Sequence, residues 1–350
     1  MDGPSLLNPS AQAPHASPVR ARSDALASGL FFIVGTGRCG TTLLQAMLMT
    51  HPRVCIPPET RFFLAYDPAL TVGDPVPLDR VDEYVHRCVR QWRLADLEIG
   101  EPELRAIVTD SDRSARAIFL GIMARWAQRQ GKPRAGEKTP NHFKRIDRIA
   151  AVFPEAKFIH VYRDPRDVAL SMRERKWAPG PAELRRYART WSRAMRRHFD
   201  YERSLGPERY TSVKYEHLVE DPEGELRRVC AFLGEAYDPV MLDYPRRAER
   251  GYVEREKAWK GLADAPVSTS RIGRYRDALT PRQIRTCERA AGPMLGAMGY
   301  DPTPGLGDSA AWRIGDAYDW TLWRAVRIGR SVRSRLPGAA PRDDAETPRA

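Results

Sequence analysis

A short apolar run that leads into a glycine-rich loop constrains this chain more than any other feature. Residues 30–34 read Leu-Phe-Phe-Ile-Val, and the loop Gly35-Thr36-Gly37-Arg38-Cys39-Gly40-Thr41-Thr42 follows directly. The apolar run is typical of a buried parallel strand, and the mostly apolar residues 41–49 indicate a buried helix. Because the glycines allow close backbone approach, the loop amides and the helix N-terminus can point at an anion. The order strand, loop, helix therefore predicts a phosphate-binding loop.

The loop differs from that of an ordinary nucleoside triphosphatase. Gly35 and Gly40 keep the usual spacing, but Thr41 stands where a lysine would reach the β- and γ-phosphates. The long cation is Arg38, inside the loop, and no apolar strand ends in a lone Asp that could hold magnesium through water. The pattern favours an anion shorter than a magnesium triphosphate, with no bound metal. A glycine turn without a ligand is the alternative.

Strands and helices alternate along the rest of the chain. We expect further strands at 157–162 and 210–214, and irregular structure at 67–80 and 245–275. Residues 131–134 should break the chain, and 138–140 should lead into a helix ending near residue 153. Helices are expected at 78–92, 101–130, 165–176, 182–204, 222–233 and 281–298. This alternation predicts an α/β protein with three layers (α/β/α) and a mainly parallel sheet.

The chain of 350 residues, 42% of them hydrophobic, suffices for one large domain, expected at 29–302. Residues 1–28 are rich in Pro, Ala and Ser and lack the apolar core of a signal peptide, so we expect a disordered N-terminal arm. Residues 303–336 interleave tryptophans with arginines. They predict a basic amphipathic extension that lies on an anionic membrane surface or packs back on the domain. A disordered tail is expected at 337–350.

The net charge and the cysteines bear on partners and location. A formal net charge of +12 predicts an anionic partner, for which a nucleic acid, a membrane surface, a nucleotide or an acidic acceptor would all fit. The five cysteines are odd in number and lack metal-site spacing, so we expect buried, reduced thiols in a cytoplasmic protein. No run of about 18 apolar residues occurs that could span a bilayer.

A second anion site is predicted at the strand ending at residue 162. Arg163 follows this strand directly, at the edge where open α/β sheets bind ligands. Ser171 and Arg175 are four residues apart on the next helix and share one face. The three side chains could clamp a second phosphate. The alternative is a surface salt-bridge network with nearby carboxylates, namely those of Asp164, Asp167 and Glu174.

Together these segments resemble the 5′-phosphosulfate loop and the 3′-phosphate motif of sulfotransferases that use 3′-phosphoadenosine 5′-phosphosulfate (PAPS). The residues of these motifs are similar to those of tyrosylprotein sulfotransferases and their bacterial relatives. The matching stretches keep the family's order and are 37–42, 59–61, 138–140, 158–172, 215–219, 293–295 and 299–302. The resemblance implies the sulfotransferase variant of the fold of P-loop nucleoside triphosphatases.

The resemblance also implies residue roles. The 5′-phosphosulfate would be held by the loop, namely by Arg38, Cys39, Gly40, Thr41 and Thr42. The 3′-phosphate would be held by Arg163, Ser171 and Arg175, and the adenosine would lie near Tyr215. Arg274 and Lys260 are further candidate donor contacts. Glu59 aligns with the family's general base and Lys138 with a catalytic lysine. The sequence departs from the family where Trp259-Lys260-Gly261 stands in place of a stretch with a cofactor-site serine.

The implied function is transfer of a sulfuryl group from PAPS to an acceptor hydroxyl by in-line displacement. Glu59 would take the proton, Arg38 and Lys138 would stabilise the leaving oxygen, and no metal is required. Four histidines are alternative bases: His51, His142, His160 and His217. The expected acceptor is a peptide tyrosine, or else a metabolite, lipid or sugar, and not a nucleic acid. Peripheral membrane contact and a homodimer are candidate associations. Alternative functions are a P-loop phosphotransferase or nucleotide hydrolase, and a non-catalytic anion- or membrane-binding module.

Overall fold

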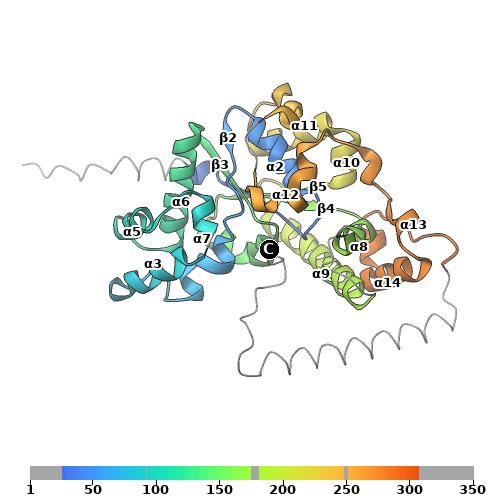
Figure 1. Cartoon of the computed structure of the whole chain (residues 1–350), viewed down its shortest axis with the longest axis horizontal. Helices are drawn as coiled ribbons and strands as arrows, with labels where there is room; N and C mark the ends of the chain where they lie inside the picture. The colour runs from blue at the N-terminus through green and yellow to red at the C-terminus, as the bar shows by residue number, and fades with distance from the viewer. Residues whose placement is uncertain (1–25, 92, 175–180, 248–250, 307–350) are drawn as a thin grey trace, which may run out of the picture.

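A five-stranded parallel sheet forms the centre of the protein (Figure 1). The computed structural model describes residues 26–91, 93–174, 181–247 and 251–306. The strands are β1 (Phe31–Gly35), β2 (Val54–Cys55), β3 (Arg134–Lys138), β4 (Lys157–Tyr162) and β5 (Tyr210–Lys214). Their order is β2-β3-β1-β4-β5, and every neighbouring pair is parallel. The predicted parallel α/β sheet is confirmed.

Helices cover both faces of the sheet. On one face lie α3 (Val81–Val89), α4 (Arg93–Asp96), α5 (Glu101–Thr109), α6 (Ala115–Gln130), α7 (Ile146–Val152) and α9 (Pro181–Leu205). On the other lie α2 (Thr41–Thr50), α10 (Tyr215–Glu220) and α11 (Pro222–Leu233). At one end are α8 (Pro165–Glu174), α13 (Tyr275–Ala278), α14 (Pro281–Ala291) and α15 (Met294–Ala297). The one-turn α12 (Lys257–Lys260) belongs to the irregular segment predicted at 245–275.

Alternation along β1 explains why the core has two main parts. Phe32 and Val34 face the cluster under α6 and α9, whereas Phe31 and Ile33 face the cluster under α2 and α11. All four side chains are fully buried. The predicted three-layer architecture is confirmed.

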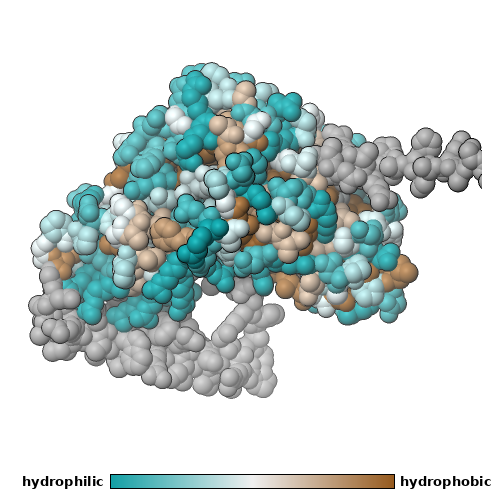
Figure 2. Space-filling model, turned by 180° about the vertical axis from the view of Figure 1, so that it is seen from behind, coloured by the Kyte–Doolittle hydropathy of each residue, from teal (hydrophilic) through white to brown (hydrophobic). Residues whose placement is uncertain are grey.

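Most of the surface seen in Figure 2 is hydrophilic, and hydrophobic residues show only in small patches between the hydrophilic ones.

The sequence prediction missed β2 and β3. Residues 131–134 were expected to break the chain, yet Arg134–Lys138 forms a strand beside β1. Its sequence Arg-Ala-Gly-Glu-Lys has no apolar run, so the usual strand pattern is absent. Position 136 has to be glycine, because a Cβ there would lie 2.2 Å from the ring of Phe31. The strand is selected by its neighbour on the sheet rather than by its own composition.

Two predicted helices are interrupted. The expected helix at 101–130 divides into α5 and α6, since Ser114 caps α6 by accepting a hydrogen bond from the amide of Ala117. The expected helix at 281–298 divides at Gly292, which has a positive φ of 59°. The start of α8 at Pro165 confirms the predicted helix start after Asp164.

The core extends into the predicted N-terminal arm. Leu26 and Ala27 are buried, so the core includes two residues that were assigned to the N-terminal arm. Residues 1–25, and the extension and tail from residue 307, lie outside the described residues. Within those described, no helix is both long and apolar enough to cross a membrane. All five cysteines are free and buried, as predicted.

Two histidines in the core should make folding stability depend on pH. Nδ1 of His160 lies 3.3 Å from Nδ1 of His198, and Phe143 stacks on the His160 ring. Burial lowers the pKa of both histidines, that of His160 well below 6.5. Below about pH 6.5 the unfolded chain therefore binds protons that the folded chain does not. The free energy of unfolding should fall there by up to about 1.4 kcal/mol per pH unit per histidine.

Thermal unfolding at about pH 7.5 and about pH 5.5 tests this linkage. His160→Phe should reduce the difference in melting temperature between the two conditions. His86, on the exposed face of α3, offers a matched control, and His86→Gln should leave that difference unchanged. An equal acid-induced loss of stability in His160→Phe and the wild type would show that the buried pair is not responsible.

Candidate active site

The carboxyl ends of three neighbouring strands bring the predicted site residues together. Ile33 of β1 pairs with Lys138 at the end of β3 and with Ile159 of β4. The loop after β1, Lys138, and Arg163 just after β4 therefore lie along one edge of the sheet. Ligands of open α/β sheets bind at this edge.

A cavity of about 360 Å³ opens at this edge. Its walls come from the loop after β1, residues 59–61, α8 and the irregular segment 256–274. Among the predicted site residues it is lined by Arg38, Gly40, Thr41, Thr42, Glu59, Arg163, Ser171, Tyr215, Lys260 and Arg274. A second cavity of about 310 Å³ shares Arg38, Ser171, Arg271 and Arg274 with the first. The structure thus collects most of the predicted residues around one space.

The backbone of the glycine-rich loop has the shape that an anion site requires. Gly40 has a φ of 105°, and a Cβ on it would lie 2.5 Å from Cδ2 of Tyr215. Helix α2 begins at Thr41 without a side-chain cap, so its first amides face the cavity edge. Cys39 contributes backbone only: its side chain is fully buried, and burial raises the pKa of the thiol to about 11.

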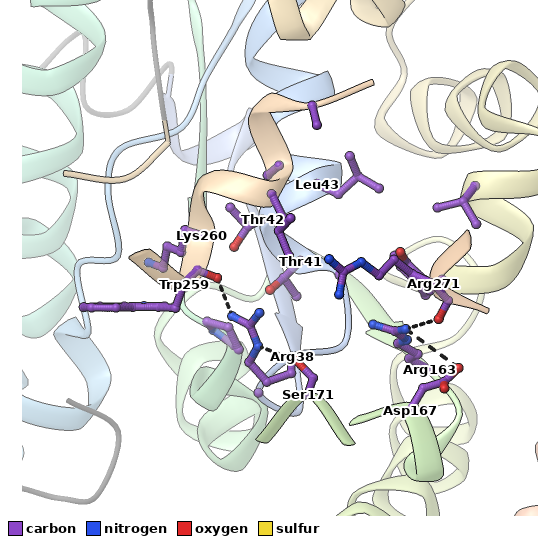
Figure 3. A pocket seen from close by; sticks show the side chains of 18 of the residues that line it. Arg38, Thr41, Thr42, Leu43, Arg163, Asp167, Ser171, Trp259, Lys260 and Arg271 are labelled. Carbon is purple, nitrogen blue, oxygen red and sulfur yellow. Dashed lines mark hydrogen bonds and ion pairs between the residues drawn. The ribbon is translucent and has the colours of Figure 1, made fainter. Parts of the chain in front are cut away.

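Arg38 crosses the cavity from the loop. Its Nε donates to Oγ of Ser171 at 3.1 Å, and its Nη1 donates to the carbonyl of Trp259 at 2.7 Å (Figure 3). Arg38 has a positive φ of 68°, a left-handed conformation that is uncommon for a residue other than glycine. One guanidinium therefore connects the loop, α8 and the irregular segment.

Arg163 is held on several sides. Its guanidinium lies 4.2 Å from the centre of the Tyr215 ring, and Asp167 pairs with it at 3.7 Å. Its Nη2 donates to the carbonyl of Arg271 (Figure 3). Asp167 also accepts from the amides of Gly273 and Tyr275, at 2.8 and 3.0 Å. Arg163 is thus fixed against Tyr215, where the sequence prediction expected the adenosine.

The other arginines near the predicted second anion site differ in where the structure places them. Arg274 lines both cavities and pairs with Glu174 at 2.7 Å, and Arg271 lies 3.9 Å from the same carboxylate. The alternative salt-bridge network therefore exists in part, but around Glu174 and Asp167 at the cavity wall. Arg175 lies outside the described residues.

Glu59 and Lys138, 79 residues apart in sequence, are in direct contact. Nζ of Lys138 lies 2.7 Å from Oε1 of Glu59, and Nζ of Lys260 lies 2.7 Å from the same oxygen. The side chain of Lys138 is fully buried, that of Lys260 is 7% exposed and that of Glu59 14% exposed. The sequence suggested Lys260 as a phosphate contact, whereas in the structure its ammonium binds carboxylates.

The charges in this cluster set the protonation of its members. Burial alone would raise the pKa of Glu59, but Lys138 and Lys260 outweigh it and hold that pKa well below its usual range. Burial lowers the pKa of Lys138 to about 8, although Glu59 opposes this shift. At neutral pH the carboxylate is therefore ionised and Lys138 is mostly charged.

A fully buried carboxylate fixes Glu59 and Lys138 relative to each other. Oε1 of Glu137 accepts from the hydroxyls of Thr60 and Thr139, at 2.8 and 2.6 Å, and from the Thr60 amide at 3.2 Å. Its Oε2 contacts Nδ1 of His142 at 2.8 Å. Glu137 thus joins the residue after Glu59 to the residue after Lys138, on the opposite side of β3 from the cavity.

None of the four alternative histidine bases lines the cavities found among the described residues. His142 binds Glu137 and His160 packs with His198. His51 contacts the carbonyl of Ala236 at 2.9 Å. These contacts are structural, which leaves Glu59 as the candidate base in the cavity wall.

Sequence reasoning missed several residues of the cavity wall: Arg61, Arg93, Asp167, Glu256 and Arg271. Two of them had a signal in the sequence, since Arg61 belongs to the matching stretch 59–61 and Asp167 lies four residues after Arg163, but neither was assigned to the site. Arg93 reaches the site through Glu256, which it binds at 2.8 Å. No local pattern connects two residues so far apart in sequence.

The chain is similar to known sulfotransferases over much of its length. A family model described as "Sulfotransferase family" matches residues 31–239. A protein-tyrosine sulfotransferase of Drosophila melanogaster is 28% identical over 296 residues, which are 81% of this chain and 54% of that protein. The protein-tyrosine sulfotransferase A of Caenorhabditis elegans is 26% identical, over 79% of this chain and 68% of that one. The chain thus spans little more than half of the Drosophila relative.

Solved structures agree with this match. The sulfotransferase domain of the Synechococcus PCC 7002 olefin synthase is 25% identical, with a TM-score of 0.52, over 75% of this chain and 94% of that one. The sulfotransferase domain of the curacin biosynthetic pathway, 18% identical, shares the fold with a TM-score of 0.57 over 78% of this chain and 98% of that one. The family model covers more than half of the chain, and its range contains the glycine-rich loop, Glu59, Lys138 and Arg163. The chain therefore belongs to the sulfotransferase family.

Proposed function

We propose that the protein transfers a sulfuryl group from PAPS to an acceptor hydroxyl. The observation that carries this proposal is the contact of Glu59 with Lys138 in the wall of the cavity that also holds the glycine-rich loop and Arg163. The loop supplies an anion site at one end of the cavity, and Arg163 supplies a second. Glu59 lines this cavity, and Lys138 contacts Glu59 from the buried side. Membership of the sulfotransferase family supports PAPS as the donor.

The residues present fit a donor with two anionic ends. The α2 N-terminus and Arg38 suit the 5′-phosphosulfate, while Arg163 and Ser171 suit the 3′-phosphate. One buried polar atom supports this fit, because Nε of Arg163, a residue of the cavity lining, has no hydrogen-bond partner in the described part of the chain. Tyr215 lies between the two anion sites, against both Gly40 and Arg163. Its ring offers a surface for the adenosine.

The proposed chemistry uses three side chains. The donor supplies an activated sulfuryl group whose leaving group is adenosine 3′,5′-bisphosphate. Glu59 accepts the proton of the acceptor hydroxyl while the new S–O bond forms and the bond to the bridging oxygen breaks. Arg38, which lines the cavity, stabilises the negative charge that grows on the bridging oxygen, and the buried Lys138 holds Glu59 ionised and in place. A fixed donor such as Arg38 is worth ~3 kcal/mol, or about 10²–10³ in rate.

A peptide tyrosine is the acceptor that we propose to test first. The relatives from Drosophila and Caenorhabditis are named protein-tyrosine sulfotransferases. Arg61, two residues after Glu59, lines the cavity. A metabolite, a lipid or a sugar remains an alternative acceptor. Residues 303–350 do not enter this proposal, and a cytoplasmic location, peripheral membrane contact and a homodimer stay predictions.

Calorimetry with adenosine 3′,5′-bisphosphate tests the donor site. We expect binding in the micromolar range, roughly tenfold or more tighter than that of ATP, because the second anion site recognises a 3′-phosphate. Transfer of ³⁵S from labelled PAPS to tyrosine peptides, sugars, lipids and phenols then identifies the acceptor class. Chelation of divalent metals should leave the transfer rate unchanged.

The same measurements separate the alternative functions. A phosphotransferase or nucleotide hydrolase would require magnesium and prefer ATP to adenosine 3′,5′-bisphosphate. A non-catalytic module would bind anions but transfer no label to any acceptor. Either result would contradict the proposed function.

A further inference from the structure

Lys260 takes part in a chain of buried ion pairs behind the candidate base. Its Nζ lies 2.7 Å from Oε1 of Glu59 and 2.9 Å from Oε2 of Glu256. Glu256 is held in turn by Arg93 at 2.8 Å. The side chains of Lys260, Glu256 and Arg93 are 7%, 1% and 7% exposed. This chain joins α12 and the turn before it to α4, and all three residues line the cavity.

The two oxygens of Glu59 have different surroundings. Lys138 and Lys260 both bind Oε1. Oε2 accepts no hydrogen bond from any described residue, although the Glu59 side chain lines the cavity and is 14% exposed. One oxygen is therefore clamped by two ammonium groups, and the other is directed to the solvent-accessible part of the cavity. A carboxylate that must accept a proton from a bound hydroxyl needs such an open oxygen.

Lys260 is well placed to fix this orientation of Glu59, because two other contacts hold Lys260 and its helix in position. The Glu256 carboxylate holds the ammonium from the side away from Glu59, and α12 is further fixed where the carbonyl of Trp259 accepts from Arg38. The buried stem of Lys260 loses little further rotamer freedom when it binds Glu59. With Lys260 in place, ammonium groups from two different elements hold the same oxygen of Glu59.

We propose that Lys260 is a positioning residue for Glu59: together with Lys138 it clamps Oε1, so that Oε2 is the atom that receives the proton of the acceptor. The family resemblance gives Lys260 no such role, and Trp259-Lys260-Gly261 stands where the family has a cofactor-site serine. This inference rests on the proposed function for the proton transfer itself. The clamp of Glu59 by Lys260 can be measured without turnover.

The test compares Lys260→Met and Lys260→Arg with the wild type. Loss of a cation bound to Glu59 should move the acid limb of the kcat/KM profile to higher pH by about one unit. Loss of orientation should lower kcat roughly 10- to 100-fold. Lys260→Arg keeps a cation between the two carboxylates and should recover most of both effects. The affinity for adenosine 3′,5′-bisphosphate should change by less than about twofold in both variants.

A matched control is available one turn away. Lys257 lies on the same helix but pairs with Glu254 at the surface, where the two side chains are 52% and 78% exposed. Lys257→Met should change neither the pH profile nor kcat. An acid limb that is the same in Lys260→Met and the wild type would overturn the proposal. So would a large loss of adenosine 3′,5′-bisphosphate affinity without a shift of the limb, since Lys260 would then be a phosphate contact.

A second measurement separates this inference from the proposed function. In protein labelled with ¹³C at the glutamate carboxyl carbons, the Glu59 signal can be assigned with Glu59→Gln and titrated by NMR. Its titration should move to higher pH in Lys260→Met and stay in place in Lys257→Met, whether or not any acceptor is sulfated. A missing shift would refute the clamp even in an active enzyme. A shift in a protein that transfers no sulfuryl group would uphold the clamp and refute the transfer.

Discussion

Glu59→Gln and Lys138→Met should each lower kcat of sulfuryl transfer by about 10²–10⁴. The first removes the proton acceptor. The second removes a buried cation that contacts this carboxylate at 2.7 Å and holds it ionised and in place. Because the two side chains act as a unit, the double variant should lose little more than the worse single variant. Single-turnover rates with labelled PAPS measure this effect.

Two controls separate a loss of catalysis from other effects of these substitutions: the affinity for the donor product and a matched surface variant. Lys138 lies behind Glu59 and is fully buried, so adenosine 3′,5′-bisphosphate should bind Lys138→Met within about fivefold of the wild type. Lys144 is exposed six residues further along, and Lys144→Met should behave as the wild type. If Lys138→Met and Glu59→Gln kept half of the wild-type kcat, the catalytic assignment would be wrong.

Lys138 should also define the basic limb of the pH profile. Burial lowers its pKa to about 8, so the charge is complete below that pH and is lost as the pH rises through it. The rate of sulfuryl transfer should therefore decline above about pH 8, provided the acceptor does not ionise in the same range. An acceptor alcohol with a high pKa satisfies this condition. Lys138→Arg, if active, should show no decline there.

Arg163→Met should weaken binding of adenosine 3′,5′-bisphosphate by about 10²-fold, which corresponds to ~3 kcal/mol for lost charge-assisted hydrogen bonds. The guanidinium is fixed between the Tyr215 ring and Asp167 before any anion binds, so little ordering is required. Arg163→Lys keeps the charge but loses the paired guanidinium hydrogen bonds and the stacking on Tyr215. Its affinity for adenosine 3′,5′-bisphosphate should therefore lie between those of Arg163→Met and the wild type. Calorimetry gives the affinities.

Adenosine 5′-monophosphate identifies which phosphate Arg163 recognises. It lacks the 3′-phosphate, and its weaker binding should be nearly the same in Arg163→Met and the wild type. Arg203 pairs with Asp200 at the surface, and Arg203→Met is the charge-matched control. An equal loss of affinity for the 5′-monophosphate and the 3′,5′-bisphosphate in Arg163→Met would contradict the assignment. Because Asp167 is left buried without Arg163, thermal melting should accompany these titrations.

Much of the fold could be predicted because its strongest signals are local. The apolar runs before the glycine-rich loop and before Arg163 match β1 and β4 to within a residue. The Asp-Pro pairs that start α8 and α11 also act through neighbouring residues. In contrast, β3 has no local strand signal. Its small and charged residues are explained only by the Phe31 ring above Gly136 and by the partners of Glu137 and Lys138.

The amino-acid sequence by itself determined the glycine-rich loop between a strand and a helix and predicted that it binds an anion, since Arg38 and the paired threonines are encoded in consecutive residues. With the family resemblance it also indicated Glu59 and Lys138. Only the tertiary structure decided that these two are in contact, and that Lys260 binds both Glu59 and Glu256 rather than standing free for a phosphate. The physical reason is that ion pairing depends on distance in space. Residues 59, 138 and 260 meet only because a loop, a strand end and a one-turn helix converge at one edge of the parallel sheet.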